Sequence, residues 1–171
     1  GKILATGNHD RIMSYAMQGT QIVDLQGSTV IPGLNDSHLH LIRGGLNYNL
    51  ELRWEGVPSL ADALRMLKDQ ADRTPSPQWV RVVGGWSEFQ FAERRMPTIE
   101  ELNEAAPDTP VCVLHLYVRA LLNRAALKAV GYTKETPNPP GGEIVRDNNG
   151  NPTGLLIAKP NAMILYATLA K

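Results

Sequence analysis

Two histidines separated by a single residue are the clearest candidates for chemistry in this sequence. His38 and His40 stand in the stretch "VIPGLNDSHLHL", and Asp36 precedes His38 by two positions. Residues i and i+2 of a β-strand project to the same face, so both imidazoles can reach one ion from a strand end. Imidazole suits zinc and similar divalent metals, and Asp36 can accept a hydrogen bond that fixes a ligand's tautomer. Spacing alone leaves two interpretations open: a metal site, or polar side chains that bond to solvent or backbone.

Composition excludes some partners. The chain has 171 residues, enough for one domain, with 17 basic and 17 acidic residues. No net charge draws it to nucleic acid or an anionic membrane, and no apolar run reaches the roughly 18 residues of a membrane span. The single cysteine, Cys112, cannot form an internal disulfide, so we expect a buried core residue and a cytoplasmic protein.

The elements that must position the histidines begin with short β segments. Residues 2–7 read as a strand, and residues 10–17 as a helix capped by Asp10. Residues 21–32 read as a hairpin that turns at Gln26-Gly27, with glycine supplying the positive φ. The histidine stretch then begins a new strand after Pro32-Gly33.

The middle of the chain alternates between helical and strand patterns. Ser59 is placed to cap a helix whose apolar residues share one face, and Thr98 and Glu101 have capping-box spacing. Gly131 closes a later helix. The order over residues 59–131 is helix, strand, helix, strand, helix, which favours an α/β layer; a hairpin around Asn149-Gly150 and a final helix follow.

The longer text resembles one enzyme family. Ile31, Pro32, Gly33, Asp36, His38 and His40 match, in order and spacing, the segment with which amidohydrolase-superfamily enzymes enter their first barrel strand. Further matching pieces are "GGW", "PT", "AAPDTPV" and "PPGGEIVRDNNGNPTG". Together they resemble amidohydrolase family 3, the N-substituted formamide deformylase-like group.

The resemblance implies a composite α/β fold. It assigns residues 1–33 to part of a urease-like β-sandwich, and residues 34–50 to the first strand of a TIM (β/α)₈ barrel with its following loop. Residues 51–154 would form an inserted α/β region, and residues 155–171 would return to the barrel. Such a barrel takes about 250 residues, so it would be incomplete here.

The resemblance also implies a reaction: hydrolysis of carbon–nitrogen bonds other than peptide bonds, in a small amide-type substrate, by metal-activated water. It makes His38 and His40 ligands of a divalent metal, with zinc expected, and places Asp36 behind them. Lys159 stands near the position of a bridging ligand. Two interpretations of Lys159 stay open: a carboxylated bridging lysine, or an ordinary exposed lysine.

One motif of the inserted region departs from the family. Relatives carry Asp-Gly-His before an asparagine, whereas this chain has Leu116-Tyr117-Val118 ahead of Asn123. Tyr117, Arg119 and Asn123 are therefore weaker candidates for substrate contact than the motif would make them.

Three ring-bearing residues near these candidates have two interpretations. Trp86 is a candidate substrate contact, but Trp86 and Trp79 also suit a core or a pocket wall. His115 fits a hydrogen-bonded strand histidine better than a metal ligand.

No catalytic residue is assigned within these 171 residues, since neither a second histidine pair nor a strand-end aspartate general base is found. Two histidines are fewer than the usual three protein ligands of a catalytic metal, so we expect little or no hydrolase activity from this chain alone. The alternative is an inactive folded fragment that self-associates into homo-oligomers through unpaired strand edges.

Overall fold

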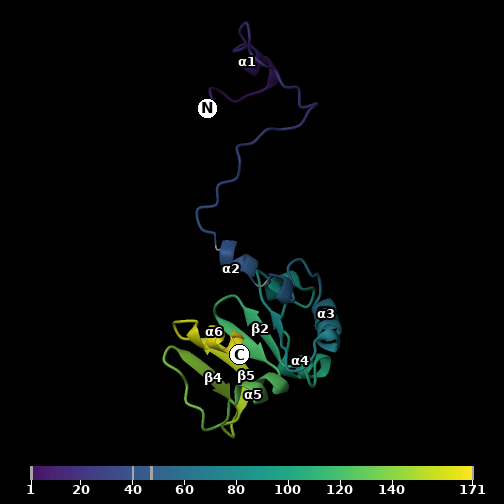
Figure 1. Cartoon of the computed structure of the whole chain (residues 1–171), viewed down its shortest axis with the longest axis vertical. Coiled ribbons are helices and arrows are strands. Elements are labelled where there is room, and N and C mark those ends of the chain that lie inside the picture. Colours follow the sequence, from purple (N-terminus) through teal and green to yellow (C-terminus); the bar gives the residue numbers. More distant parts are fainter. Residues whose placement is uncertain (1, 40, 47, 171) are drawn as a thin grey trace. The chain divides into compact units, whose positions relative to one another are not determined.

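A computed structural model of the chain describes residues 2–39, 41–46 and 48–170 (Figure 1). The chain divides into two compact units, Gly1–Leu39 and His40–Lys171. Among the described residues, no helix is long and apolar enough to cross a membrane.

The described residues of the first unit, 2–39, contain one short helix, α1 (His9–Met13). Its N-cap is Asn8, whose side chain accepts a hydrogen bond from the backbone N–H of Arg11, so the prediction of Asp10 as the cap was wrong by two residues. The helix also ends earlier than predicted. Asn8 is the cap because its side-chain oxygen lies within hydrogen-bonding distance of the Arg11 N–H in the first turn of the helix.

The predicted strands of this unit are not formed. Residues 2–7, 21–25, 28–32 and 34–39 have no strand pairing, although Gln26 and Gly27 make the expected turn with φ of 52° and 84°. An isolated two-stranded hairpin is marginal in water unless more strands or a packed face support it. The apolar side chains here have no such cover: Leu4 is 80% exposed and Leu34 is 94% exposed.

The second unit is built on a mixed sheet. Among the described residues it has five strands in the order β1-β2-β3-β5-β4, of which β1 and β2 run parallel and the other neighbours antiparallel. The strands are β1 (Val80–Val82), β2 (Val111–His115), β3 (Arg119–Leu122), β4 (Gly142–Arg146) and β5 (Pro152–Ala158). The helical elements are α2 (Leu41–Leu46), η1 (Tyr48–Leu50), α3 (Leu60–Arg73), η2 (Glu88–Gln90), α4 (Ile99–Ala105), α5 (Arg124–Val130) and α6 (Met163–Leu169).

Strand β2 shows why helices are needed on both faces of the sheet. All its residues are buried, with Val111 and Val113 in one core cluster and Cys112 and Leu114 in another. Helices α3 and α4, adjacent in Figure 1, pack on the first face, and α5 and α6 on the second. The α/β layer predicted for this region is therefore confirmed, and Cys112 is the buried core residue expected.

The helix ends follow the sequence signals. Ser59 accepts from Asp62 N–H, and Thr98 forms a reciprocal capping box with Glu101. Gly131 closes α5 in the left-handed conformation, with φ of 75°. These predictions are confirmed because each depends only on residues within one turn of the helix end.

The order predicted for residues 59–131 misses one strand. A single strand was expected between the second and third helices, but β2 ends at His115 and a second strand, β3, starts at Arg119. Leu116 turns the chain with φ of 51°, a conformation uncommon for a residue with a side chain. The turn contains no Gly, Pro or Asn, so the usual turn signals are absent.

Both edges of the sheet are covered. Leu52 forms an isolated parallel bridge with Val82 at the outer edge of β1, and its N–H donates to Arg81 O at 2.8 Å. At the other edge, the N–H of Ile144 in β4 donates to Asn138 Oδ1 at 3.0 Å. Covered edges of this kind discourage pairing with a second chain.

Candidate functional site

Asp36 and His38 of the histidine motif lie in the first unit, where a local turn joins them. The backbone N–H of His38 donates to Asp36 Oδ1 at 2.9 Å, an Asx-type turn. Asp36 thus fixes the backbone that carries His38, a role that the sequence reasoning did not assign to it. His40 lies outside the described residues. Within the described part of the chain, no group of three or more His, Cys, Asp or Glu side chains is placed to hold a metal.

The donor chemistry of the motif fits a divalent metal in kind. Neutral imidazoles are ordinary zinc ligands, but a catalytic zinc usually has three protein ligands plus water. Two histidines would therefore supply only part of such a ligand set. If a metal is bound, it lowers the pKa of a bound water and polarises a carbonyl.

Lys159, the candidate bridging residue, follows β5 in the second unit. Its ammonium forms an ion pair with Glu143 across the β4–β5 hairpin, and its side chain is 62% exposed. Carboxylation would replace this cation with an anion beside Glu143, so the pair would have to open before Lys159 could act as a ligand.

Trp86 and Asn123, two of the candidate substrate contacts, are fully buried. Trp86 donates from Nε1 to Leu114 O at 3.0 Å and lies in an aromatic cluster with Trp54 and Phe91. Asn123 caps α5 and also donates from Nδ2 to the carbonyls of Ala106 and Thr109 at 2.7 and 2.8 Å. Neither side chain exposes surface to a ligand in this conformation.

Asn123 illustrates a structural use of a residue that matches a family motif. Its Oδ1 accepts from the N–H groups of Val111 and Ala126, both at 2.9 Å. The side chain therefore ties the start of β2 to the start of α5. Loss of such a buried residue would leave several backbone groups without partners.

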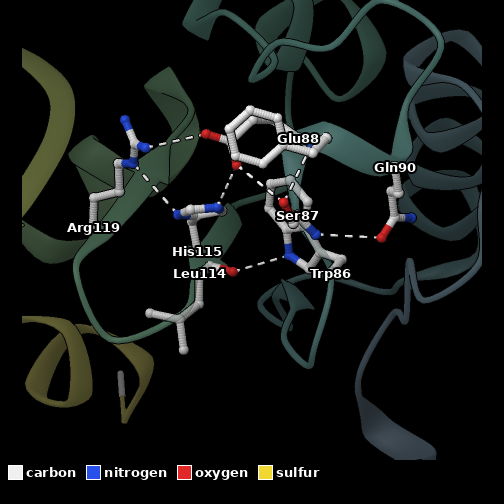
Figure 2. A network of polar contacts seen from close by, with 8 residues as sticks. Trp86, Ser87, Glu88, Gln90, Leu114, His115 and Arg119 are labelled. Carbon is white, nitrogen blue, oxygen red and sulfur yellow. Dashed lines mark hydrogen bonds and ion pairs between the residues drawn. The ribbon is translucent and has the colours of Figure 1, made fainter.

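A charged cluster that sequence reasoning did not anticipate surrounds His115 (Figure 2). His115 Nε2 lies 2.8 Å from Glu88 Oε2, and Arg119 Nε donates to His115 Nδ1 at 3.4 Å. Arg119 also approaches Glu88 Oε1 at 3.5 Å. In the neutral ring this arrangement puts the proton on Nε2, because Nδ1 is the acceptor. The three residues come from η2, the end of β2 and the start of β3.

Burial and charge act in opposite directions on Glu88. Burial raises the pKa of its carboxyl, but its own backbone N–H and the charges of His115 and Arg119 outweigh burial, so the pKa of Glu88 is lowered. A carboxylate that stays ionised can hold His115 in one tautomer. His115 is 5% exposed, and its two ring nitrogens contact Glu88 and Arg119. These contacts agree with the prediction of a hydrogen-bonded strand histidine.

Tyr117 and Arg119, the other candidate contacts, are more accessible. Tyr117 is 58% exposed, and the side chain of Arg119 is 38% exposed. The ring centroid of Tyr117 lies 6.1 Å from that of Tyr166 on α6. Both tyrosines line a cavity of about 750 Å³, together with Arg81, Val83 and Leu116.

This cavity opens where the parallel strands β1 and β2 end. The glycine pair Gly84-Gly85 after β1 and the turn at Leu116 after β2 both contribute to its wall. Ligands of open α/β sheets commonly bind beyond the carboxyl ends of parallel strands. Sequence reasoning missed Arg81 and Tyr166, since neither belongs to a recognisable motif.

Comparison with known proteins agrees with these motifs. The model of the Amidohydrolase family matches residues 21–171. The chain is 37% identical over 169 residues to the putative amidohydrolase YtcJ of Bacillus subtilis, covering 98% of this chain and 32% of that protein. It is 33% identical over 159 residues to the N-substituted formamide deformylase of Arthrobacter pascens, covering 92% of this chain and 29% of that protein. The chain therefore belongs to the amidohydrolase family.

A solved structure has a similar fold. An uncharacterized metal-dependent hydrolase from Pyrococcus horikoshii superposes with a TM-score of 0.51 at 24% identity, over 95% of this chain and 29% of that chain. Its likeness concerns the fold. The chain spans about a third of the length of the curated relatives named above.

Proposed function

We propose that the protein carrying this chain is a metal-dependent hydrolase of non-peptide carbon–nitrogen bonds in small amide-type substrates. The observation that carries the proposal is the membership of the amidohydrolase family together with the Asp36-x-His38-x-His40 motif. Similarity to an N-substituted formamide deformylase supports amides as the substrate class. Zinc is the expected metal, because the two proposed donors are imidazoles.

In this proposal the two histidines keep the roles that the family resemblance gives them, and Asp36 takes the role that its hydrogen bond supports. His38 and His40 bind the metal, and Asp36 holds the turn that presents His38, as its hydrogen bond to the His38 N–H supports. Lys159 would complete the ligand set only after its ion pair with Glu143 opens. Residues 1–33 and 34–50 belong to a β-sandwich and to the first barrel strand of the complete protein, whose other strands would supply the pairing that these segments need.

Turnover by the complete protein tests the proposal. Release of amine from a set of N-substituted formamides is measured before and after removal of metal by a chelator, and again after zinc is restored. We expect activity to disappear and return. The His38→Ala and His40→Ala variants should lose it, whereas His9→Ala, an exposed histidine in the same unit, should keep it. Chelator-resistant turnover would overturn the proposal.

A second candidate concerns the 171 residues on their own: an inactive fragment that self-associates. Both edges of the sheet in the second unit are covered, so those strand edges do not support it. The exposed apolar side chains of the first unit do support it, among them Ile31 at 66% and Leu34 at 94%. Sedimentation velocity should then show a concentration-dependent increase in size that Leu34→Ser reduces, and a constant monomer would exclude it.

A further inference from the structure

The cavity beside β1 and β2 contains an arginine that pairs with no carboxylate of the described residues. Arg81, in the middle of β1, is half-buried and donates from Nε to the carbonyl of Leu169 at 3.0 Å. Its guanidinium carbon lies 5.8 Å from the centroid of the Trp79 ring. Among the described residues, Arg81 takes part in no ion pair with Asp or Glu. A guanidinium has five N–H donors, and Leu169 accepts from only one nitrogen of Arg81, so this side chain has donors left for an anion.

Arg53, the other arginine on the cavity wall, provides the contrast. It lies 2.9 Å from Glu51 and 2.5 Å from Glu55. These contacts hold the pKa of Arg53 above its ordinary value, the Glu55 hydrogen bond being the largest contribution. Two carboxylates therefore already bind Arg53, whereas no carboxylate in the described part of the chain binds Arg81.

The rest of the cavity wall suits an apolar or aromatic group. Tyr117 and Tyr166 face one another at 6.1 Å with a tilt of 47° between their rings. Val83, Leu116 and Leu169 add aliphatic surface. Leu116 keeps a left-handed backbone at the turn that carries Tyr117, and strain of this kind is more common where a chain serves a ligand. The volume, about 750 Å³, is typical of a small-molecule site.

We infer that this cavity binds a small molecule that joins a carboxylate to an aromatic or apolar body, with Arg81 receiving the carboxylate and Tyr117 the body. Guanidinium and carboxylate match as a bidentate pair, and the tyrosine rings can stack on the apolar part. The inference rests on the proposed function only in taking this molecule to be a substrate or product. Binding itself requires neither metal nor turnover.

The test compares two probes of nearly the same shape, phenylacetate and phenylacetamide. An NMR titration of the chain in low-chloride buffer follows the amides of Gly84 and Gly85, which line the cavity. We expect phenylacetate to bind at least about tenfold more tightly, since one charge-assisted hydrogen bond amounts to that factor or more. Equal affinity of the two probes, or no shift with either, would overturn the inference.

Substitutions identify the residues that cause the preference for phenylacetate. Arg81→Gln should remove the preference for phenylacetate, and Arg81→Lys should retain part of it; the control Arg124→Gln, an exposed arginine at the start of α5, should leave it intact. Tyr117→Ala should weaken the binding of both probes by a similar factor. If Arg81→Gln does not fold, the comparison of the two probes on the unaltered chain still decides the question.

A separate readout distinguishes this inference from the proposed function. His38→Ala should bind phenylacetate as the unaltered chain does. If phenylacetate binds but the histidine variants keep their metal, the proposed function is wrong and the inference about the cavity is supported. If the complete protein hydrolyses amides but Arg81→Gln binds both probes unchanged, the cavity inference fails alone.

Discussion

The two units of this chain differ in how much secondary structure they form and how much apolar surface they bury. The first, Gly1–Leu39, carries Asp36 and His38, yet it contains one short helix and exposes most of its apolar side chains. The second, His40–Lys171, has a sheet with buried clusters on both faces. The segments of the first unit that were predicted to be strands need neighbouring strands to fix them, whereas the strands of the second unit pair with one another. The predicted strand that carries Asp36 and His38 therefore depends on pairing that this unit does not supply.

The largest expected difference between the units is in hydrogen exchange. Amides of β2 should exchange only on global unfolding, which for a domain of this size costs about 5–15 kcal/mol. Amides of residues 21–32 should exchange with almost no protection, because no strand pairs with them. Exchange measured by NMR on the 171-residue chain checks this. Strong protection over residues 21–32 would show that the hairpin forms without help from the rest of the protein.

The next largest effect is expected from a substitution in the aromatic cluster of the second unit, and it concerns the free energy of unfolding. Trp86→Ala removes a fully buried ring that packs on Trp54 and Phe91, and should lower the free energy of unfolding by about 3–5 kcal/mol. Urea denaturation measures the loss. Phe89→Ala is the matched control, because that neighbouring ring is 67% exposed and should cost below about 0.5 kcal/mol. Equal losses would show that the two positions are equally packed.

The Glu88–His115–Arg119 cluster should make a smaller, pH-dependent contribution to the free energy of unfolding. Glu88→Gln should cost about 1–3 kcal/mol at pH 7, as expected for a charged hydrogen bond of low exposure. Because the pKa of Glu88 is lowered on folding from 4.5, its contribution is present above pH 4.5 and is lost as the pH falls further through the folded value.

Denaturation curves at several pH values measure this dependence. The difference between Glu88→Gln and the unaltered chain should narrow below pH 4.5, the ordinary value for this carboxyl. Glu104→Gln, an exposed residue of α4, serves as the control and should show little effect at any pH. A gap that stays constant in acid would mean that the charge of Glu88 is not what stabilises the fold.

The success of sequence reasoning followed the range of the interactions involved. The Ser59 cap, the Thr98–Glu101 capping box and Gly131 depend on neighbours within one turn, and all three are as predicted. The turn of the β4–β5 hairpin at Asn149-Gly150 is equally local, and Gly150 has a φ of 84°. The strands expected over residues 2–7 and 21–32 fail because a strand needs partners that local sequence does not reveal.

The candidate site was less predictable than the fold. Nothing in the spacing of Glu88, His115 and Arg119 indicates that a helical turn and two strand ends bring them together. Asn123 matched a motif associated with substrate, but the structure uses its side chain to cap α5 and to join β2. That Arg81 lacks an Asp or Glu partner among the described residues could be recognised only after the positions of the carboxylates were known.

The smallest effect is expected in the first unit. Leu34→Ser should change the free energy of unfolding of the chain by less than about 0.5 kcal/mol, because Leu34 is 94% exposed and loses no packing. Thermal or urea unfolding of the 171-residue chain gives the value. A loss of more than about 1 kcal/mol would show that residue 34 packs against a core even here.

The metal content of the complete protein tests the central claim most directly. Elemental analysis after exhaustive dialysis should find bound divalent metal in the unaltered protein and in His9→Ala. His38→Ala and His40→Ala should retain at most about a tenth of it, since each would remove a proposed imidazole ligand from a site with few others. Unchanged metal content in both variants would contradict the assignment of His38 and His40 as metal ligands.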